Sequence, residues 1–189
     1  LRAKLDQLPP RIRCISFDVF DTLLARCVEP PDSLQRRVCA KIAAKLGAPH
    51  STESVWQARC SVENELRHAC QMRGGDHECH FEPLVERWVE RLLGHADADL
   101  IAWVHRCERQ LETLALSAKP GMIELLQHLR SRKLRIIAVS DMYLGDEHIR
   151  ALLHDCGLGE FIDQLYVSAD YGVGKYSGRL HAHVLEIEG

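Results

Sequence analysis

The sequence predicts an α/β fold: a parallel sheet with a long helical insertion after its first strand. Short apolar runs that end in polar residues indicate strands, and helical patterns separate these runs in the second half of the chain. The segment after the first run has helical periodicity only. Strands that alternate with helices favour a parallel sheet with right-handed crossovers. We therefore expect an α/β part at 1–27 and 118–189, and a helical part at 28–117.

The first apolar run covers residues 12–17 and is followed directly by Asp18. Such a run is typical of a buried parallel strand. In open α/β sheets, ligands bind at the carboxyl ends of strands, where Asp18 would lie. An aspartate that only caps a turn is the ordinary alternative.

Four amphipathic helices are expected in the insertion, because apolar residues recur there at helical spacing. They cover about 32–46, 51–73, 82–93 and 97–116. The apolar stripe of the last helix is expected to comprise Leu100, Val104, Cys107, Leu111 and Leu114.

The second half alternates between helices and strands. Helices are expected at about 121–131 and 146–155 and from 178 onward, and strands at about 134–139 and 161–167. Ser140 and Asp141 follow the second strand, and Lys175 lies in a glycine-rich loop beyond the third.

Asp18, Ser140 and Lys175 are thus predicted to share one rim of the sheet. A carboxylate, a hydroxyl and an ammonium group there suit covalent catalysis on an anionic substrate. Asp18 would attack, Ser140 would bind the transferred group, and Lys175 would neutralise charge. Each residue taken alone is unremarkable for its position, so the prediction depends on their joint occurrence.

Composition narrows the class of protein. The formal net charge of −3 gives no electrostatic basis for binding nucleic acid, and no apolar run reaches the roughly 20 residues that span a bilayer. No signal peptide is recognisable, so we expect a cytoplasmic protein whose eight cysteines are reduced. Cys70, His77, Cys79 and His80 form a weak metal-site candidate, because their spacing matches no usual zinc pattern.

Several motifs resemble those of the haloacid dehalogenase (HAD) superfamily. Residues 17–23 (FDVFDTL) resemble its first motif, residues 139–141 its second and Gly174-Lys175 its third, and the likeness extends over 12–189. The resemblance implies a Rossmann-like core with an inserted helical cap at 28–117. Residues 16–24 and 140–144 resemble more narrowly a bacterial subgroup linked to glycosyltransferases and surface polysaccharide assembly.

The resemblance also implies roles for residues. Asp18 would be the nucleophile and a magnesium ligand, and the backbone carbonyl of Phe20 a second ligand. Thr22, Ser140 and Asp141 would bind substrate, and Lys175 would assist catalysis. The implied activity is that of a phosphatase or phosphotransferase acting on a phosphorylated small molecule. A glycosyltransferase is the implied partner.

Two departures from the family pattern leave alternatives open. The position two residues after Asp18, where the family's phosphatases carry a general acid, is Phe20, and Asp21 comes one residue later. An aromatic residue there resembles 2-haloacid dehalogenases, which need no metal. A catalytically silent scaffold or interaction module is the third interpretation.

The other departure is that the family's acidic fourth motif does not appear before Gly189. We therefore expect an incomplete magnesium site and the absence of the C-terminal strands of the core. The first strand would then be a sheet edge, open to self-association. This pattern favours the hypothesis that the sequence is part of a longer polypeptide.

Overall fold

A computed structural model describes residues 9, 11–28, 30 and 32–189. Its parallel sheet has the strand order β1–β4–β5, with β1 at Cys14–Phe17, β4 at Arg135–Ser140 and β5 at Gln164–Val167. All pairs are parallel, and Phe17 lies opposite Ala138. The predicted α/β fold with a parallel sheet is confirmed, and β1 lies at an edge of the described sheet.

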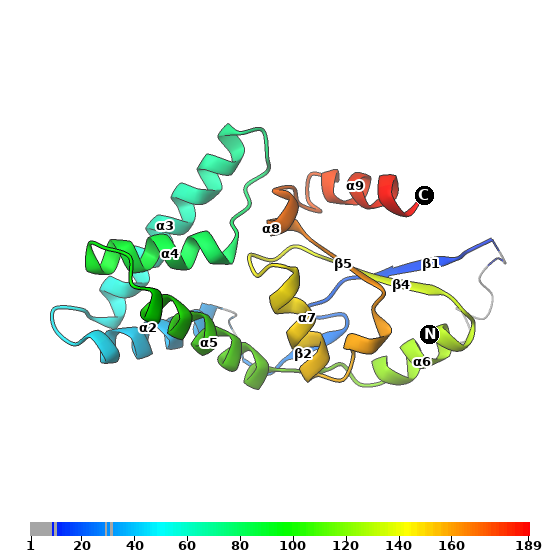
Figure 1. Ribbon diagram of the computed structural model, residues 1–189. Helices are drawn as coiled ribbons and strands as arrows, with labels where there is room; N and C mark the ends of the chain where they lie inside the picture. The colour runs from blue at the N-terminus through cyan, green and yellow to red at the C-terminus, as the bar shows by residue number, and fades with distance from the viewer. Residues whose placement is uncertain (1–8, 10, 29, 31) are drawn as a thin grey trace.

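Helices cover both faces of this sheet (Figure 1). Helix α9 (Arg179–Glu188) lies on one face, and α6 (Met122–Ser131) and α7 (Asp146–Asp155) lie on the other. Side chains of β4 alternate between the two sides: Ile137 and Val139 pack with α9, whereas Ile136 and Ala138 belong to the main core. Both faces of β4 are buried, which explains its continuous apolar run.

Four helices follow β1, as predicted, and each differs from its expected range by at most a residue or so. They are α2 (Asp32–Leu46), α3 (Thr52–Met72), α4 (Phe81–Leu93) and α5 (Ala98–Ala115). A capping box between Ser51 and Ser54 starts α3. Gly94 ends α4 in the left-handed conformation at φ 78°. We refer to α2–α5 as the helical segment.

Some short elements were not predicted. Strand β2 (Leu24–Arg26) pairs antiparallel with β3 (Leu116–Ala118), so the two chain passages at the ends of the helical segment are hydrogen-bonded to each other. The 3₁₀ turn η1 (Gly159–Phe161) includes the first residue of the strand predicted at 161–167, and β5 begins only at Gln164. Helix α8 (Ser168–Tyr171) follows β5. Strands of three residues carry too little periodicity to be recognised, because their stability depends on a partner that is distant in sequence.

The predicted inner stripe of α5 is wrong in part. Leu114 is 79% exposed, whereas Glu108 and Glu112 on the same helix are buried. Each glutamate has an arginine partner: Arg59 binds Glu108, and Arg26 binds Glu112. Periodicity assigns charged residues to the solvent side of a helix. Ion pairing across about fifty residues or more reverses that assignment here.

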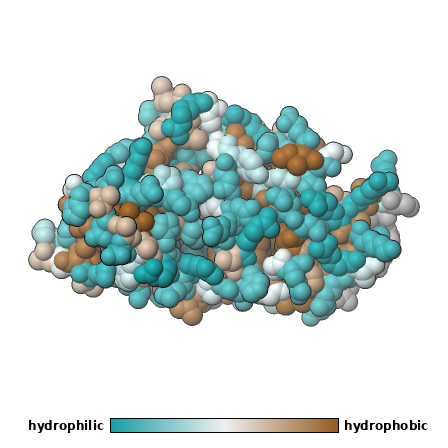
Figure 2. All heavy atoms as spheres, in the orientation of Figure 1, coloured by the Kyte–Doolittle hydropathy of each residue, from teal (hydrophilic) through white to brown (hydrophobic). Residues whose placement is uncertain are grey.

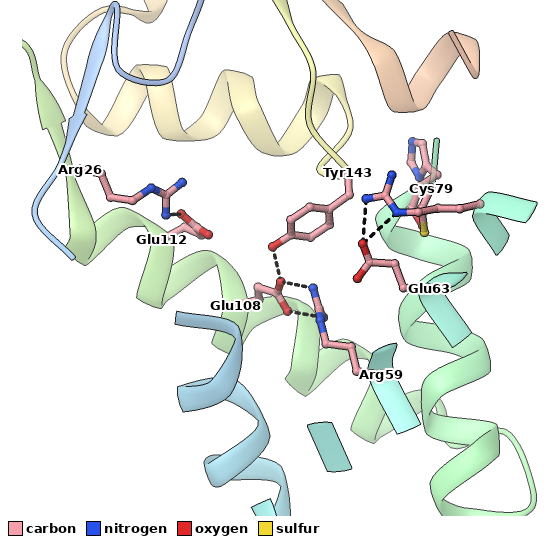
Figure 3. A network of polar contacts seen from close by, with 9 residues as sticks. Arg26, Arg59, Glu63, Cys79, Glu108, Glu112 and Tyr143 are labelled. Atoms are coloured by element: carbon pink, nitrogen blue, oxygen red, sulfur yellow. Dashed lines mark hydrogen bonds and ion pairs between the residues drawn. The ribbon is translucent and has the colours of Figure 1, made fainter. Parts of the chain in front are cut away.

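Tyr143 joins the helical segment to the sheet (Figure 3). It lies in the loop after β4, and its hydroxyl donates to Glu108 Oε1 at 2.6 Å. Arg59 donates to the two oxygens of Glu108 at 3.2 and 3.1 Å. Burial raises the pKa of Tyr143 well above its usual value, so the phenol stays protonated and acts as a donor.

The molecular surface in the view of Figure 2 is mostly hydrophilic, with apolar side chains scattered over it. Exposed apolar residues of α9 include Leu185 and Ile187. No helix in the described part of the chain is long and apolar enough to cross a membrane.

We predict that Tyr143→Phe lowers the free energy of unfolding by about 2 kcal/mol, because a buried carboxylate loses a hydrogen-bond donor while the ring still fills its place. Urea denaturation measures the change. Tyr176→Phe is the matched control, because Tyr176 is fully exposed. Equal stability of the two variants would contradict the role given to the Tyr143 hydroxyl.

Candidate active site

The structure brings Asp18 and Lys175 together at the carboxyl rim of the sheet. Lys175 Nζ donates to Asp18 Oδ1 at 2.5 Å. Thr22 Oγ1 donates to Asp18 Oδ2 at 3.1 Å. The Asp18 side chain remains 41% exposed, so its carboxylate is both oriented and accessible.

The Lys175 loop is held in place by Asp141. Both oxygens of Asp141 accept the backbone N–H of Lys175, at 2.8 and 3.0 Å. Lys175 Nζ also approaches the carbonyl oxygen of Val139 at 3.4 Å. In this geometry Asp141 positions the ammonium group beside Asp18.

Ser140 ends β4 and is 1% exposed. Its hydroxyl has no hydrogen-bond partner among the described residues. A buried hydroxyl without a partner is unfavourable, which makes Ser140 available to an oxygen atom brought by a substrate.

The loop after Asp18 holds Phe20 and Asp21, the two residues at and beside the position where the family's phosphatases carry an acid. Asp21 has φ 60° and is exposed, a conformation that aspartate tolerates better than most residues. Lys119 Nζ donates to the carbonyl oxygen of Asp21 at 2.6 Å. Arg26 lies over the ring of Phe20, 5.3 Å from its centroid. The position two residues after Asp18 thus carries an aromatic ring, and the neighbouring acid lies on the exposed side of the turn.

The loop between α3 and α4 also reaches this rim, which the sequence did not indicate. Asp76 Oδ2 accepts from the backbone N–H of Gly174 at 2.8 Å and from the hydroxyl of Ser177 at 2.5 Å. Glu78 accepts from the hydroxyl of Ser168 at 2.8 Å. These partners are about ninety to a hundred residues away in sequence, so no local pattern reveals them.

Glu78 and Gly174 approach closely. A Cβ atom at Gly174 would lie 2.9 Å from Glu78 Oε1, so only glycine fits there without displacement. Burial raises the pKa of Glu78. A cavity of about 460 Å³ adjoins this contact, with Asp76, Glu78 and Gly174 among its lining residues.

His80 links the same loop to α8. Its Nε2 lies 2.8 Å from Asp170 Oδ1, and its Nδ1 contacts Glu82. The hydrogen bond to Asp170, and then that to Glu82, raises the pKa of His80 to about 9. The imidazolium therefore connects the helical segment to the α/β part at neutral pH.

The residues around Asp18 do not make a magnesium site by themselves. The Asp18 carboxylate is already paired with Lys175, and the Asp141 carboxylate accepts the backbone N–H of Lys175. Within the described part of the chain, Asp18 belongs to no group of three ligand side chains that could hold an ion, and its further oxygen neighbour would be the carbonyl of Phe20. Among the described residues, three side chains able to bind a metal ion come together in one place only, at Glu82, His105 and His148. The candidate set of Cys70, His77, Cys79 and His80 is not assembled, and all eight cysteines are free thiols.

The fold agrees with that of several solved structures. A dehalogenase crystal structure matches with a TM-score of 0.52 and 20% identity, over 96% of this chain and 74% of that one. L-2-haloacid dehalogenase from Xanthobacter autotrophicus matches with a TM-score of 0.52 and 19% identity, over 94% of this chain and 65% of that one. 2-Haloacid dehalogenase from Pseudomonas syringae pv. Tomato DC3000 matches with a TM-score of 0.58 and 16% identity, over 86% of this chain and 66% of that one. At these identities the likeness shows the fold alone.

An α/β fold of this kind, with a carboxylate and an ammonium group at the carboxyl rim, defines a class of hydrolases. The sequence model of the haloacid dehalogenase-like hydrolases matches residues 12–189, and the chain belongs to this family. None of the curated protein sequences matches the chain.

We predict a pH-dependent stabilisation from His80. Its pKa rises from 6.5 to about 9 on folding. The contribution of His80 to the free energy of unfolding is therefore complete below pH 6.5 and is lost as the pH rises to about 9. His80→Gln should therefore lower the free energy of unfolding by about 1 kcal/mol at about pH 6, a value reduced for partial exposure to solvent. The difference in the free energy of unfolding between the wild type and His80→Gln should vanish above about pH 9.

Urea denaturation of both proteins across this pH range, in the presence of EDTA, provides the measurement. His181→Gln is the control, because His181 is exposed. A difference that does not depend on pH would show that His80 stabilises the protein by packing alone.

Proposed function

We propose that the protein hydrolyses a phosphorylated small molecule through an aspartyl-phosphate on Asp18. The observation that carries this proposal is the Asp18 carboxylate, ion-paired with Lys175 at 2.5 Å on the same rim as the unpartnered hydroxyl of Ser140. An ammonium group and a free hydroxyl suit a group with several anionic oxygens. The family match supports hydrolysis and leaves the substrate open.

In the proposed reaction, a carboxylate oxygen of Asp18 attacks phosphorus and the bond to the leaving oxygen breaks. Oδ2 is the freer oxygen, because within the described part of the chain it accepts only from Thr22, at 3.1 Å. Ser140 binds a phosphoryl oxygen, and Lys175 offsets the negative charge. Water then hydrolyses the aspartyl-phosphate and releases phosphate.

The leaving group is constrained by Phe20. With no carboxyl group two residues after Asp18, this loop provides no general acid, a role that contributes roughly 10²–10⁴-fold. We therefore propose substrates whose leaving group departs as a stable anion, such as acyl phosphates.

We propose magnesium as a cofactor that would be held by Asp18 and the Phe20 carbonyl, and no step above depends on it.

We further propose that the helical segment at 28–117 acts as a cap that shapes the pocket, with the α/β part at 1–27 and 118–189 providing the chemistry. The resemblance of residues 16–24 to the glycosyltransferase-linked subgroup supports a cytoplasmic role in surface polysaccharide metabolism, with a glycosyltransferase as partner. Self-association through β1, which lies at an edge of the sheet among the described residues, is the alternative to this partner.

Hydrolysis of a carbon–halogen bond is the second candidate, favoured by Phe20. A halide leaves without a proton, so the absence of an acid at that position has no cost for this reaction. Asp18 would attack carbon, halide would depart, and water would hydrolyse the ester. The structural likeness to dehalogenases shows the fold and adds no evidence on the substrate.

We predict that Asp18→Asn lowers phosphate release from acyl phosphates by about 10³-fold or more, because the amide is a poor nucleophile. Asp21→Asn is the matched control, since Asn tolerates the same left-handed backbone and Asp21 is exposed. Each variant is assayed for phosphate release from acyl phosphates and phosphate esters, with and without magnesium. Chloride release from 2-chloropropionate is measured in parallel.

Phosphate release that Asp18→Asn abolishes supports the first proposal. Chloride release with the same dependence on Asp18 would replace it by the second. Inactivity of the folded wild-type protein in both assays would favour the non-catalytic interaction module.

A further inference from the structure

We propose that Glu82, His105 and His148 form a binding site for a zinc-type divalent cation, which joins the helical segment to the α/β part. Glu82 lies in the first turn of α4, His105 within α5 and His148 near the start of α7. The three residues come from three helices and two parts of the fold. Their meeting is therefore a property of the tertiary structure.

The spacing of the ligand atoms fits one ion. One ligand atom from each residue lies within 4.8 Å of the others, and His148 Nδ1 is 3.4 Å from Glu82 Oε1. Zinc binds nitrogen and oxygen at about 2.0–2.1 Å, so tetrahedral ligands lie about 3.3 Å apart. The pair formed by Glu82 and His148 already has this separation, and the ligand atom of His105 lies within 4.8 Å of both.

His148 has an atom that a cation would satisfy. Its side chain is 15% exposed, and its Nδ1 is buried without a hydrogen-bond partner among the described residues. Buried polar atoms are nearly always paired, so an unpaired ring nitrogen that faces a carboxylate needs an explanation. A bound cation supplies a partner for both groups.

Phe81 orients both imidazole rings. The ring of Phe81 meets His105 edge-on at 4.8 Å between centroids and His148 at 5.1 Å. An apolar neighbour of this kind restricts rotation of both rings and limits the access of water to them.

His80 holds the carboxylate from the other side. It contacts Glu82 Oε2 and lies 2.8 Å from Asp170, which leaves Glu82 Oε1 directed at His148. Partners behind a ligand fix its orientation and are typical of built metal sites. The chain from Asp170 through His80 to Glu82 has this arrangement.

The ligand set selects the kind of ion. Two imidazoles and one carboxylate suit zinc and its neighbours in the transition series, whereas magnesium and calcium prefer oxygen ligands throughout. Three protein ligands leave a fourth position for water. An ion held there would fasten α4 and α5 to α7, which follows the loop after Ser140.

The test is a zinc titration of chelator-treated protein, read by competition with a chromogenic chelator. We expect one zinc per chain for the wild type. Glu82→Gln, His105→Ala and His148→Ala should each weaken binding by about 100-fold or more, because each removes one of three ligands. His95→Ala is the matched control, since His95 is exposed and belongs to no ligand group among the described residues.

Two further measurements separate this site from adventitious binding. Cobalt(II) bound here should give the absorption of a nitrogen–oxygen site, whereas an intense sulfur charge-transfer band would assign the ion to the free thiols and overturn the proposal. Zinc should raise the melting temperature of the wild type and of His95→Ala but not of Glu82→Gln, which preserves side-chain volume and guards against misfolding of the alanine variants. Unchanged zinc affinity in Glu82→Gln and His148→Ala, or no binding by the wild type, would also overturn the proposal.

Discussion

The contact between Lys175 and Asp18 is the interaction on which the rim of the sheet depends. Parallel pairing of β1, β4 and β5 brings the carboxyl ends of three strands to one edge, but it does not orient the side chains there. Lys175 is oriented by three supports: Asp141 holds its backbone N–H, Asp76 holds the neighbouring Gly174, and Val139 accepts from its ammonium group. A loop fixed in this way places a positive charge on one oxygen of Asp18 and leaves the other to Thr22.

The helical segment is tied to the α/β part at several points that differ in chemistry. Tyr143 reaches from the loop after β4 into the buried pair of Arg59 and Glu108 (Figure 3). His80 pairs with Asp170 on α8. Moving the segment away from the sheet would take the Tyr143 hydroxyl from a buried carboxylate, at an energetic cost. Such a movement would therefore also affect the loop that follows Ser140, because Tyr143 lies in that loop.

The chemistry of the site is limited more by what surrounds Asp18 than by Asp18 itself. Phe20 occupies the position from which a general acid would act, and Asp21 lies on an exposed left-handed turn. Leaving groups that depart without a proton are compatible with this loop, and both proposed reactions share that property. Two further carboxylates at this rim, Asp76 and Glu78, come from the helical segment and hold the Lys175 loop and Ser168.

The sequence by itself predicted the long helices, the parallel sheet and the strand-end positions of Asp18, Ser140 and Lys175, because local periodicity and strand ends are encoded in neighbouring residues. It also determined that Phe20 displaces the expected acid. Only the tertiary structure decided the burial of Glu108, the approach of Glu78 to Gly174 and the meeting of Glu82, His105 and His148. These features depend on contacts between residues tens of positions apart. Their partners are chosen by how helices pack, and short-range patterns carry no record of that choice.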